Sequence, residues 1–143
     1  MHKLLHILKA LEAYYQGQHW TAKGPSFYPD HLFFGRLYEA AGINIDAVVE
    51  IALANRSTDD SLFDTKTVLA EVLKLLMKHV KKDCCATFAG SLETALLLEG
   101  ELESLLNSLV IEYQNDLGIN NLLTTVAEAH KNRVYLINRH FKA

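Results

Sequence analysis

The sequence predicts an all-α protein: a bundle of four long helices with one short extra helix in the middle connection. Apolar residues recur three or four positions apart along most of the 143 residues, and no segment alternates in the manner of a strand. Half of the residues are hydrophobic and 22% are charged, which excludes disordered and collagen-like classes. We therefore expect one domain over residues 1–143.

The first two long helices are predicted from their apolar spacing and their prolines. The first begins near Leu4 and ends before Gly24-Pro25, because proline disfavours helix in the residue that precedes it. The second is predicted from Pro29 to about Asn55 as one continuous helix. Proline is tolerated in a first turn, and Asp30 suits a helix N-terminus.

A polar stretch over residues 56–60 is predicted to connect the second long helix to the short extra one. Asp64 or Thr65 is expected to cap this short helix, because both side chains accept hydrogen bonds from free backbone N–H groups. The helix is predicted to reach His79, and the charged residues that follow interrupt its apolar pattern.

The last two long helices are predicted in the last two fifths of the chain. The third is expected from about Ala86 to Asp116, with an apolar set rich in leucine. Gly118 is predicted to stop it, and Asn120 or Asn121 to cap the last helix, which continues to the C-terminus.

The cysteines and the net charge indicate which cellular compartment and which partners to expect. Cys84 and Cys85 are adjacent, which makes a mutual disulfide sterically awkward and lacks the spacing of a zinc site, so we expect a reduced, cytoplasmic protein. No stretch approaches the roughly 20 apolar residues that span a bilayer, so no membrane association is expected. The net charge of −3 does not favour nucleic acid.

Seven histidines suggest a metal site, and their spacing limits its form. Di-iron bundles take ligands from Glu-x-x-His pairs, whose members share one helix face. None of the seven histidines has a glutamate three residues before it. The usual di-iron centre within one chain is therefore not expected.

The second helix contains a different candidate ligand set. Asp46 and Glu50 are four residues apart and share one face, whereas His31 lies in the first turn of the same helix. Fifteen residues separate His31 from Asp46, which corresponds to roughly 22 Å along the axis. These residues can close a metal site only between two antiparallel copies of the chain. The alternative is a solvated helix face without metal.

Several motifs taken together resemble the Dps-like mini-ferritins of the ferritin-like superfamily. They are the run His19-Trp20-Thr21-Ala22-Lys23-Gly24-Pro25-Ser26-Phe27, His31 twelve residues after His19, and the pair Asp46 and Glu50. The segments Asn115–Gly118 and Glu128–Lys131 are also similar. The resemblance is specific over residues 4–56, moderate over about 100–143, and loose between these two ranges.

This resemblance implies a ferritin-like four-helix bundle with a short extra helix in the middle (B–C) connection, assembled as a hollow dodecamer. Non-haem iron would bind at subunit interfaces, with His19 and His31 from one subunit and Asp46 and Glu50 from its neighbour. Such a ferroxidase oxidises Fe(II) with peroxide or dioxygen and stores the ferric mineral in the shell. Trp20 would serve as an electron donor or as an interface anchor.

One departure from the family pattern weakens the implied ferroxidase activity. The family usually has an aspartate four residues after the second histidine, where this chain has Gly35, and neither Asp30 nor Glu39 stands at that position. A second iron would lose a ligand. The alternative function is therefore a non-catalytic ferritin-like helical assembly or interaction protein with a degenerate metal site.

DNA binding, which some family members achieve through a lysine-rich tail, is not expected here. Only Lys3 and Lys9 lie in the first fourteen residues, too few to neutralise many phosphates. Lys78, Lys81 and Lys82 form a small cluster that is typical of a solvated helix end. The expected partners are other copies of the chain and iron ions.

Overall fold

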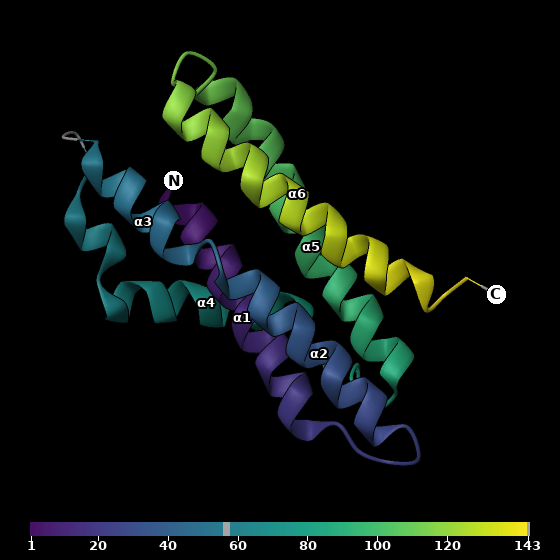
Figure 1. Ribbon diagram of the computed structural model, residues 1–143. Coiled ribbons are helices and arrows are strands. Elements are labelled where there is room, and N and C mark those ends of the chain that lie inside the picture. The colour runs from purple at the N-terminus through teal and green to yellow at the C-terminus, as the bar shows by residue number, and fades with distance from the viewer. Residues whose placement is uncertain (56–57, 143) are drawn as a thin grey trace.

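The computed structural model describes residues 1–55 and 58–142, and this part of the chain is helical without a strand. The elements are α1 (His2–Thr21), α2 (Phe27–Gly42), α3 (Ile45–Ala54), the 3-10 turn η1 (Asp60–Phe63), α4 (Thr65–His79), α5 (Phe88–Glu112) and α6 (Leu117–Arg139). The predicted all-α class is confirmed (Figure 1). Among the described helices, none has the length and apolar content that crossing a membrane requires.

Four helical segments, which we call rods, enclose the core: α1, α2 together with α3, α5, and α6. Helix α1 packs against α2 and α5, and α6 packs against α5, α2 and α3, so that the contacts close into a ring. Each rod contributes fully buried leucines, for example Leu8, Leu37, Leu102 and Leu123. The three-and-four spacing that predicted the helices therefore also identifies the side that each turns toward the core.

The order of the rods depends on one long connection. The ring of Phe88, at the start of α5, lies 5.9 Å from that of Phe33 and 5.6 Å from that of Phe34, near the start of α2. At the other end of the bundle, Ile51 of α3 lines the same cavity as Asp116, beside the α5–α6 turn. Helix α5 therefore runs parallel to α2 and α3, and the connection through α4 returns along the bundle (Figure 1).

Helix α4 is the predicted short extra helix, and its predicted cap is confirmed. The Asp64 carboxylate accepts hydrogen bonds from the backbone N–H groups of Lys66 and Thr67, at 3.0 and 3.2 Å. The helix crosses the bundle beside α1 and α5, where it buries Val68 and Val72. Residues 56–57 of the predicted polar connection lie outside the described residues.

The prediction of one continuous helix from Pro29 to Asn55 is wrong, because α2 ends at Gly42 and α3 begins at Ile45. Glycine inside a helix costs about 1 kcal/mol relative to alanine, which favours an interruption. A Cβ at Gly42 would also lie 2.7 Å from the Glu12 Oε1 atom, so the glycine allows Glu12 to pack against the α2 backbone.

The predicted boundaries of the last two helices also need correction. Helix α5 begins after a Thr87 cap and ends at Glu112, inside the predicted range. Asp116 caps α6 by accepting a hydrogen bond from the Ile119 N–H at 2.9 Å, so Gly118 does not stop a helix. Asn120 lies within α6, where its side-chain amide donates to the Tyr113 carbonyl at 2.6 Å, and Asn121 also lies inside the helix.

Candidate metal centre

His19 and His31 meet at one end of the bundle. His19 lies in the last turn of α1, and His31 lies in the first turns of α2. Gly24 adopts a φ of 91° in the turn between them, a conformation that glycine adopts without steric cost. The two imidazole rings stack with 3.7 Å between their centroids and 20° between their planes. The twelve-residue spacing thus places two potential metal ligands in contact.

The backbone fixes the proton positions of both rings. The Nδ1 atom of His19 lies 2.7 Å from the carbonyl oxygen of His31, and the Nδ1 atom of His31 lies 2.7 Å from that of His19. A carbonyl oxygen only accepts hydrogen bonds, so each Nδ1 carries the proton and donates. In the neutral rings both Nε2 atoms therefore keep the lone pair with which histidine binds metals.

Gly35 makes room for this pair. A Cβ at this position would lie 3.0 Å from Nδ1 and 3.1 Å from Cε1 of His19. The imidazole thus packs directly on the α2 backbone, in space that any side chain at position 35 would contest. The departure from the family pattern is coupled to the placement of His19, because an aspartate here would meet the ring.

One aromatic ring stacks on the histidine pair, and two exposed aromatic residues lie close to it in the sequence. Phe27 stacks on His31 with 5.2 Å between ring centroids. Trp20, the candidate electron donor, is 69% exposed, and Tyr28 is 67% exposed. Exposed aromatic groups beside a polar site are typical of surfaces that contact another protein.

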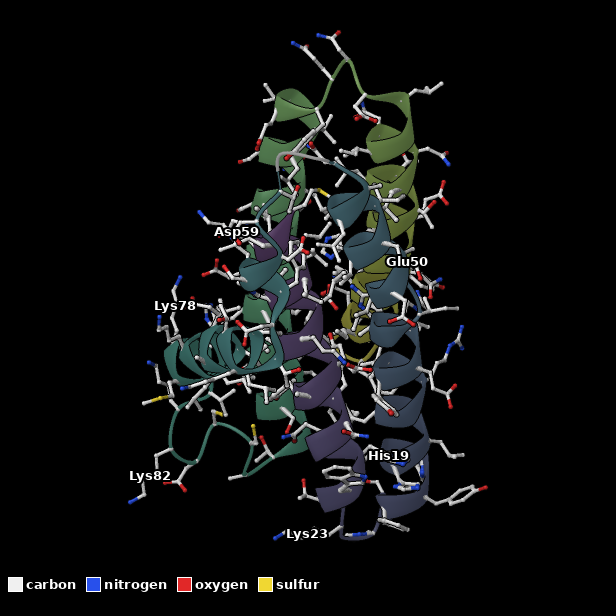
Figure 2. The ribbon with its side chains drawn as sticks, turned by 90° about the vertical axis from the view of Figure 1, so that its left-hand side faces the viewer. His19, Lys23, Glu50, Asp59, Lys78 and Lys82 are labelled. Carbon is white, nitrogen blue, oxygen red and sulfur yellow. The ribbon has the colours of Figure 1, made fainter. Side chains whose placement is uncertain are left out.

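The predicted carboxylates lie elsewhere on the chain. Asp46 and Glu50 lie on α3 and are exposed, and Figure 2 shows Glu50 far along the bundle from His19. One chain therefore does not bring all four predicted ligands together. Across residues 1–55 and 58–142, no group of three or more His, Cys, Asp or Glu side chains is arranged to hold a metal ion.

The two acids that could replace the missing ligand at position 35 have other surroundings. The Asp30 carboxylate accepts a hydrogen bond from the Ser26 hydroxyl at 2.7 Å, and Glu39 is exposed on α2. In the lysine cluster, Lys78 forms an ion pair with Glu101. The Lys81 ammonium group lies 3.5 Å from the Met77 carbonyl oxygen. These contacts fit the predicted helix end.

A second polar cluster, which the sequence reasoning missed, occupies the core. Glu99 of α5 is 1% exposed and accepts hydrogen bonds from three residues. The donors are the Tyr15 hydroxyl at 2.6 Å, His130 Nδ1 at 2.7 Å, and Arg133 through Nε at 2.6 Å and Nη2 at 3.1 Å. We call these four residues the core cluster.

Electrostatics inside the core cluster favour the ionised carboxylate. Burial alone would raise the pKa of Glu99, but the hydrogen bond from His130 and the charge of Arg133 outweigh it and hold the pKa below its ordinary value. Burial, followed by the nearby Glu99 charge, raises the pKa of Tyr15 well above its ordinary value. Because Arg133 already supplies the positive charge, the cluster has little attraction left for a metal cation.

The sequence did contain a signal for the core cluster. Glu99 follows Leu92 and Ala95 and precedes Leu102 at core spacings of three and four. His130 and Arg133 fit the same spacing in α6. Polar residues at core positions on two neighbouring helices indicate a buried pair.

The geometry supports cation binding by the histidine pair. The two Nε2 atoms, with free lone pairs, lie at the α1–α2 end of the bundle. A metal ion bound there would need further ligands from outside this part of the chain. Comparisons of the chain with protein-family models, with curated proteins and with solved structures return no match.

Proposed function

We propose that this protein binds and stores iron, oxidising Fe(II) with peroxide or dioxygen at sites shared between copies of the chain. The observation that carries the proposal is the reciprocal pairing of His19 and His31, which commits both Nδ1 protons to the backbone. Two Nε2 lone pairs are thereby oriented before any metal arrives, which lowers the cost of binding.

The helix order supports the proposal. Two helix pairs joined by one long crossover connection, with the third rod parallel to the second, is the connectivity of ferritin-like bundles. In this chain the middle of the bundle contains the core cluster, whose carboxylate is already paired with Arg133. A metal site at the surface is compatible with that arrangement.

A second copy of the chain would complete the site. His31 lies near the start of α2 and Asp46 near the start of α3, which follows α2 along the bundle, so two antiparallel copies would place each histidine pair beside the other copy's carboxylates. The exposed Trp20 and Tyr28 would be covered by the same contact. We propose a closed homo-oligomer, with the dodecamer as its form.

The proposed ligand set suits the reaction. Two imidazole nitrogens and two carboxylates are ligands that non-haem iron accepts. Fe(II) is the substrate, and the negative charges of Asp46 and Glu50 favour the more highly charged ferric product. Trp20 lies next to His19 in the chain, where an indole can supply an electron.

The first test follows ferric absorbance after Fe(II) is added to the purified protein, with and without hydrogen peroxide. We expect oxidation faster than in buffer, and a return to the buffer rate in the double variant Asp46→Ala/Glu50→Ala. The matched control is Glu93→Ala, which removes an exposed carboxylate of α5 and should keep the wild-type rate.

Sedimentation of the same samples tests the shared site separately. The wild type and the double variant should both sediment as a closed oligomer, because the carboxylates bind iron and do not hold the assembly together. A monomer would contradict the shared site. A stable oligomer without any acceleration of Fe(II) oxidation would overturn the ferroxidase and favour the non-catalytic assembly.

A further inference from the structure

Cys84 and Cys85 are adjacent in the chain, and the turn that contains them brings their side chains together. The Cys84 N–H donates to the Lys81 carbonyl at 3.2 Å, and the Ala86 N–H donates to the Asp83 carbonyl at 3.2 Å, so two tight turns overlap. Asp83 has a φ of 62° between them. The result is a separation of 3.1 Å between the two sulfur atoms, both of which belong to free cysteines.

This turn is held in place by two helices. A Cβ at Gly90 would lie 2.2 Å from the Cys84 carbonyl oxygen, so the glycine lets the turn contact the start of α5. On the other side, the Cys85 sulfur lies 3.4 Å from the Tyr14 hydroxyl of α1. Figure 2 shows this loop, marked by Lys82, on the side of the bundle away from Glu50. The sulfur pair is therefore a defined feature of the fold, separate from the candidate metal centre.

The two thiols differ in their protonation. The Tyr14 hydroxyl donates its proton to the Ser91 carbonyl at 2.7 Å, so it has no proton left with which to stabilise a Cys85 thiolate 3.4 Å away. Burial raises the pKa of the Cys85 thiol. Burial opposes ionisation of the Cys84 thiol too, but the Cys85 S–H, whose sulfur lies 3.1 Å from that of Cys84, can donate to the Cys84 thiolate, and the pKa of the Cys84 thiol is lowered.

We propose that Cys84 and Cys85 form a peroxide-reactive dithiol, in which Cys84 is the nucleophile and Cys85 the resolving thiol. The Cys84 thiolate attacks one oxygen of hydrogen peroxide, and the O–O bond breaks. Hydroxide leaves, and Cys84 becomes a sulfenic acid. The Cys85 sulfur then attacks the Cys84 sulfur, and the S–O bond breaks. Together with the two thiol protons, one peroxide yields one disulfide and two waters.

The disulfide formed in this way is easily reversed. The two sulfur atoms need to approach by about 1 Å to reach bonding distance. Adjacent Cα atoms are only about 3.8 Å apart, below the usual range of about 4.4–6.8 Å for a disulfide, so the closed ring is strained and readily reduced by thiols. The awkward geometry predicted from the sequence thus makes the bond labile while leaving it within reach.

The test treats the reduced full-length protein with equimolar hydrogen peroxide, with a chelator present to exclude iron chemistry. We expect each chain to lose two titratable thiols and the mass of two hydrogen atoms, with one peptide containing both linked cysteines. Dithiothreitol should restore both thiols. Disulfide-linked dimers, or a gain of oxygen without disulfide, would overturn the proposal.

Two serine variants separate the roles of the thiols. Cys85→Ser should keep the peroxide reactivity and stop at a sulfenic acid that dimedone traps, since the resolving thiol is gone. Cys84→Ser should consume peroxide at least about tenfold more slowly, because the remaining thiol is protonated and half-buried. Equal rates in the two variants would contradict the assignment. The chelator keeps iron out of the reaction of all three proteins, so this test is independent of the proposed iron site.

Discussion

Two polar clusters of this protein contain histidine, and they differ in whether their polar atoms are already paired within the chain. In the core cluster, Glu99 accepts hydrogen bonds from three neighbours inside one chain, and its charge is paired with that of Arg133. In the histidine pair, only the Nδ1 atoms are bonded, and the described chain offers no partner to either Nε2 atom. The closed cluster is suited to hold helices together, and the open one to bind a ligand.

The contrast extends to where each cluster lies. The core cluster joins α1, α5 and α6 in the middle of the bundle, where an uncompensated charge is costly. The histidine pair lies at the α1–α2 end, where solvent or a second chain can reach it. The presence of a histidine therefore does not by itself indicate a metal site in a helical bundle. A ring nitrogen with an unused lone pair that a ligand can reach does.

The largest effect should come from breaking the core cluster. Glu99→Ala leaves Arg133 without a counter-charge in the core and should lower the free energy of unfolding by about 3–5 kcal/mol. Urea denaturation followed by circular dichroism measures the change. Glu103→Ala removes an exposed carboxylate of the same helix and should change stability by no more than about 0.5 kcal/mol. Similar effects of both variants would show that the cluster does not hold the helices together.

A smaller effect is expected from acid. Since the pKa of Glu99 is lowered in the folded state, its contribution is fully present above the ordinary carboxylate pKa and is lost as the pH falls through the folded-state value. The stability advantage of the wild type over Glu99→Gln should therefore shrink between neutral pH and about pH 3. Urea midpoints at both pH values measure it, and a constant difference between the two proteins would refute the assignment.

The smallest effect tests the open cluster through two glycines. Gly100→Ala, with nothing within 4 Å of the new Cβ, should stabilise α5 by about 0.5–1 kcal/mol. Gly35→Ala should not show this gain, because His19 is held by the His31 carbonyl and cannot move away without losing that bond. Thermal unfolding measures the difference. Equal stabilisation by both substitutions would show that the His19 ring is free to shift.

Metal binding by the same two glycine variants provides a further test of the histidine pair. Gly35→Ala should weaken binding of Zn(II), used as a redox-inactive probe, whereas Gly100→Ala should leave it unchanged. Titration of both variants measures the dissociation constants. Unchanged binding in both would contradict the placement of the cation at the His19 ring.

The helical architecture was predictable because helix spacing, caps and breaks are local properties of the chain. The Asp64 cap and the short extra helix were identified from a few neighbouring residues. The break after Gly42 was not, because the contact that favours a glycine there comes from Glu12 of another helix. The cap of α6 was misassigned because Asp116, Asn120 and Asn121 all have side chains that suit a helix start, and it is Asp116 that accepts the hydrogen bond from the Ile119 N–H.

The candidate site divides in the same way. The spacing of His19 and His31 placed them correctly at facing helix ends, yet their reciprocal backbone bonds depend on the turn at Gly24. In the sequence Gly35 is only a missing ligand, because its role beneath the imidazole depends on how α1 packs against α2. The core cluster was missed because Glu99, His130 and Arg133 meet only after α5 and α6 pack.

The reciprocal imidazole bonds have a consequence for the order in which the protein is built. They join residues only twelve positions apart, so the loop they close costs little chain entropy, and such local contacts form early in folding. A chain still emerging during synthesis can therefore pair α1 with α2 and present both lone pairs before α5 and α6 exist. The histidine half of the proposed site would then form before the subunits assemble. Each new subunit would meet its partner with that half already in place.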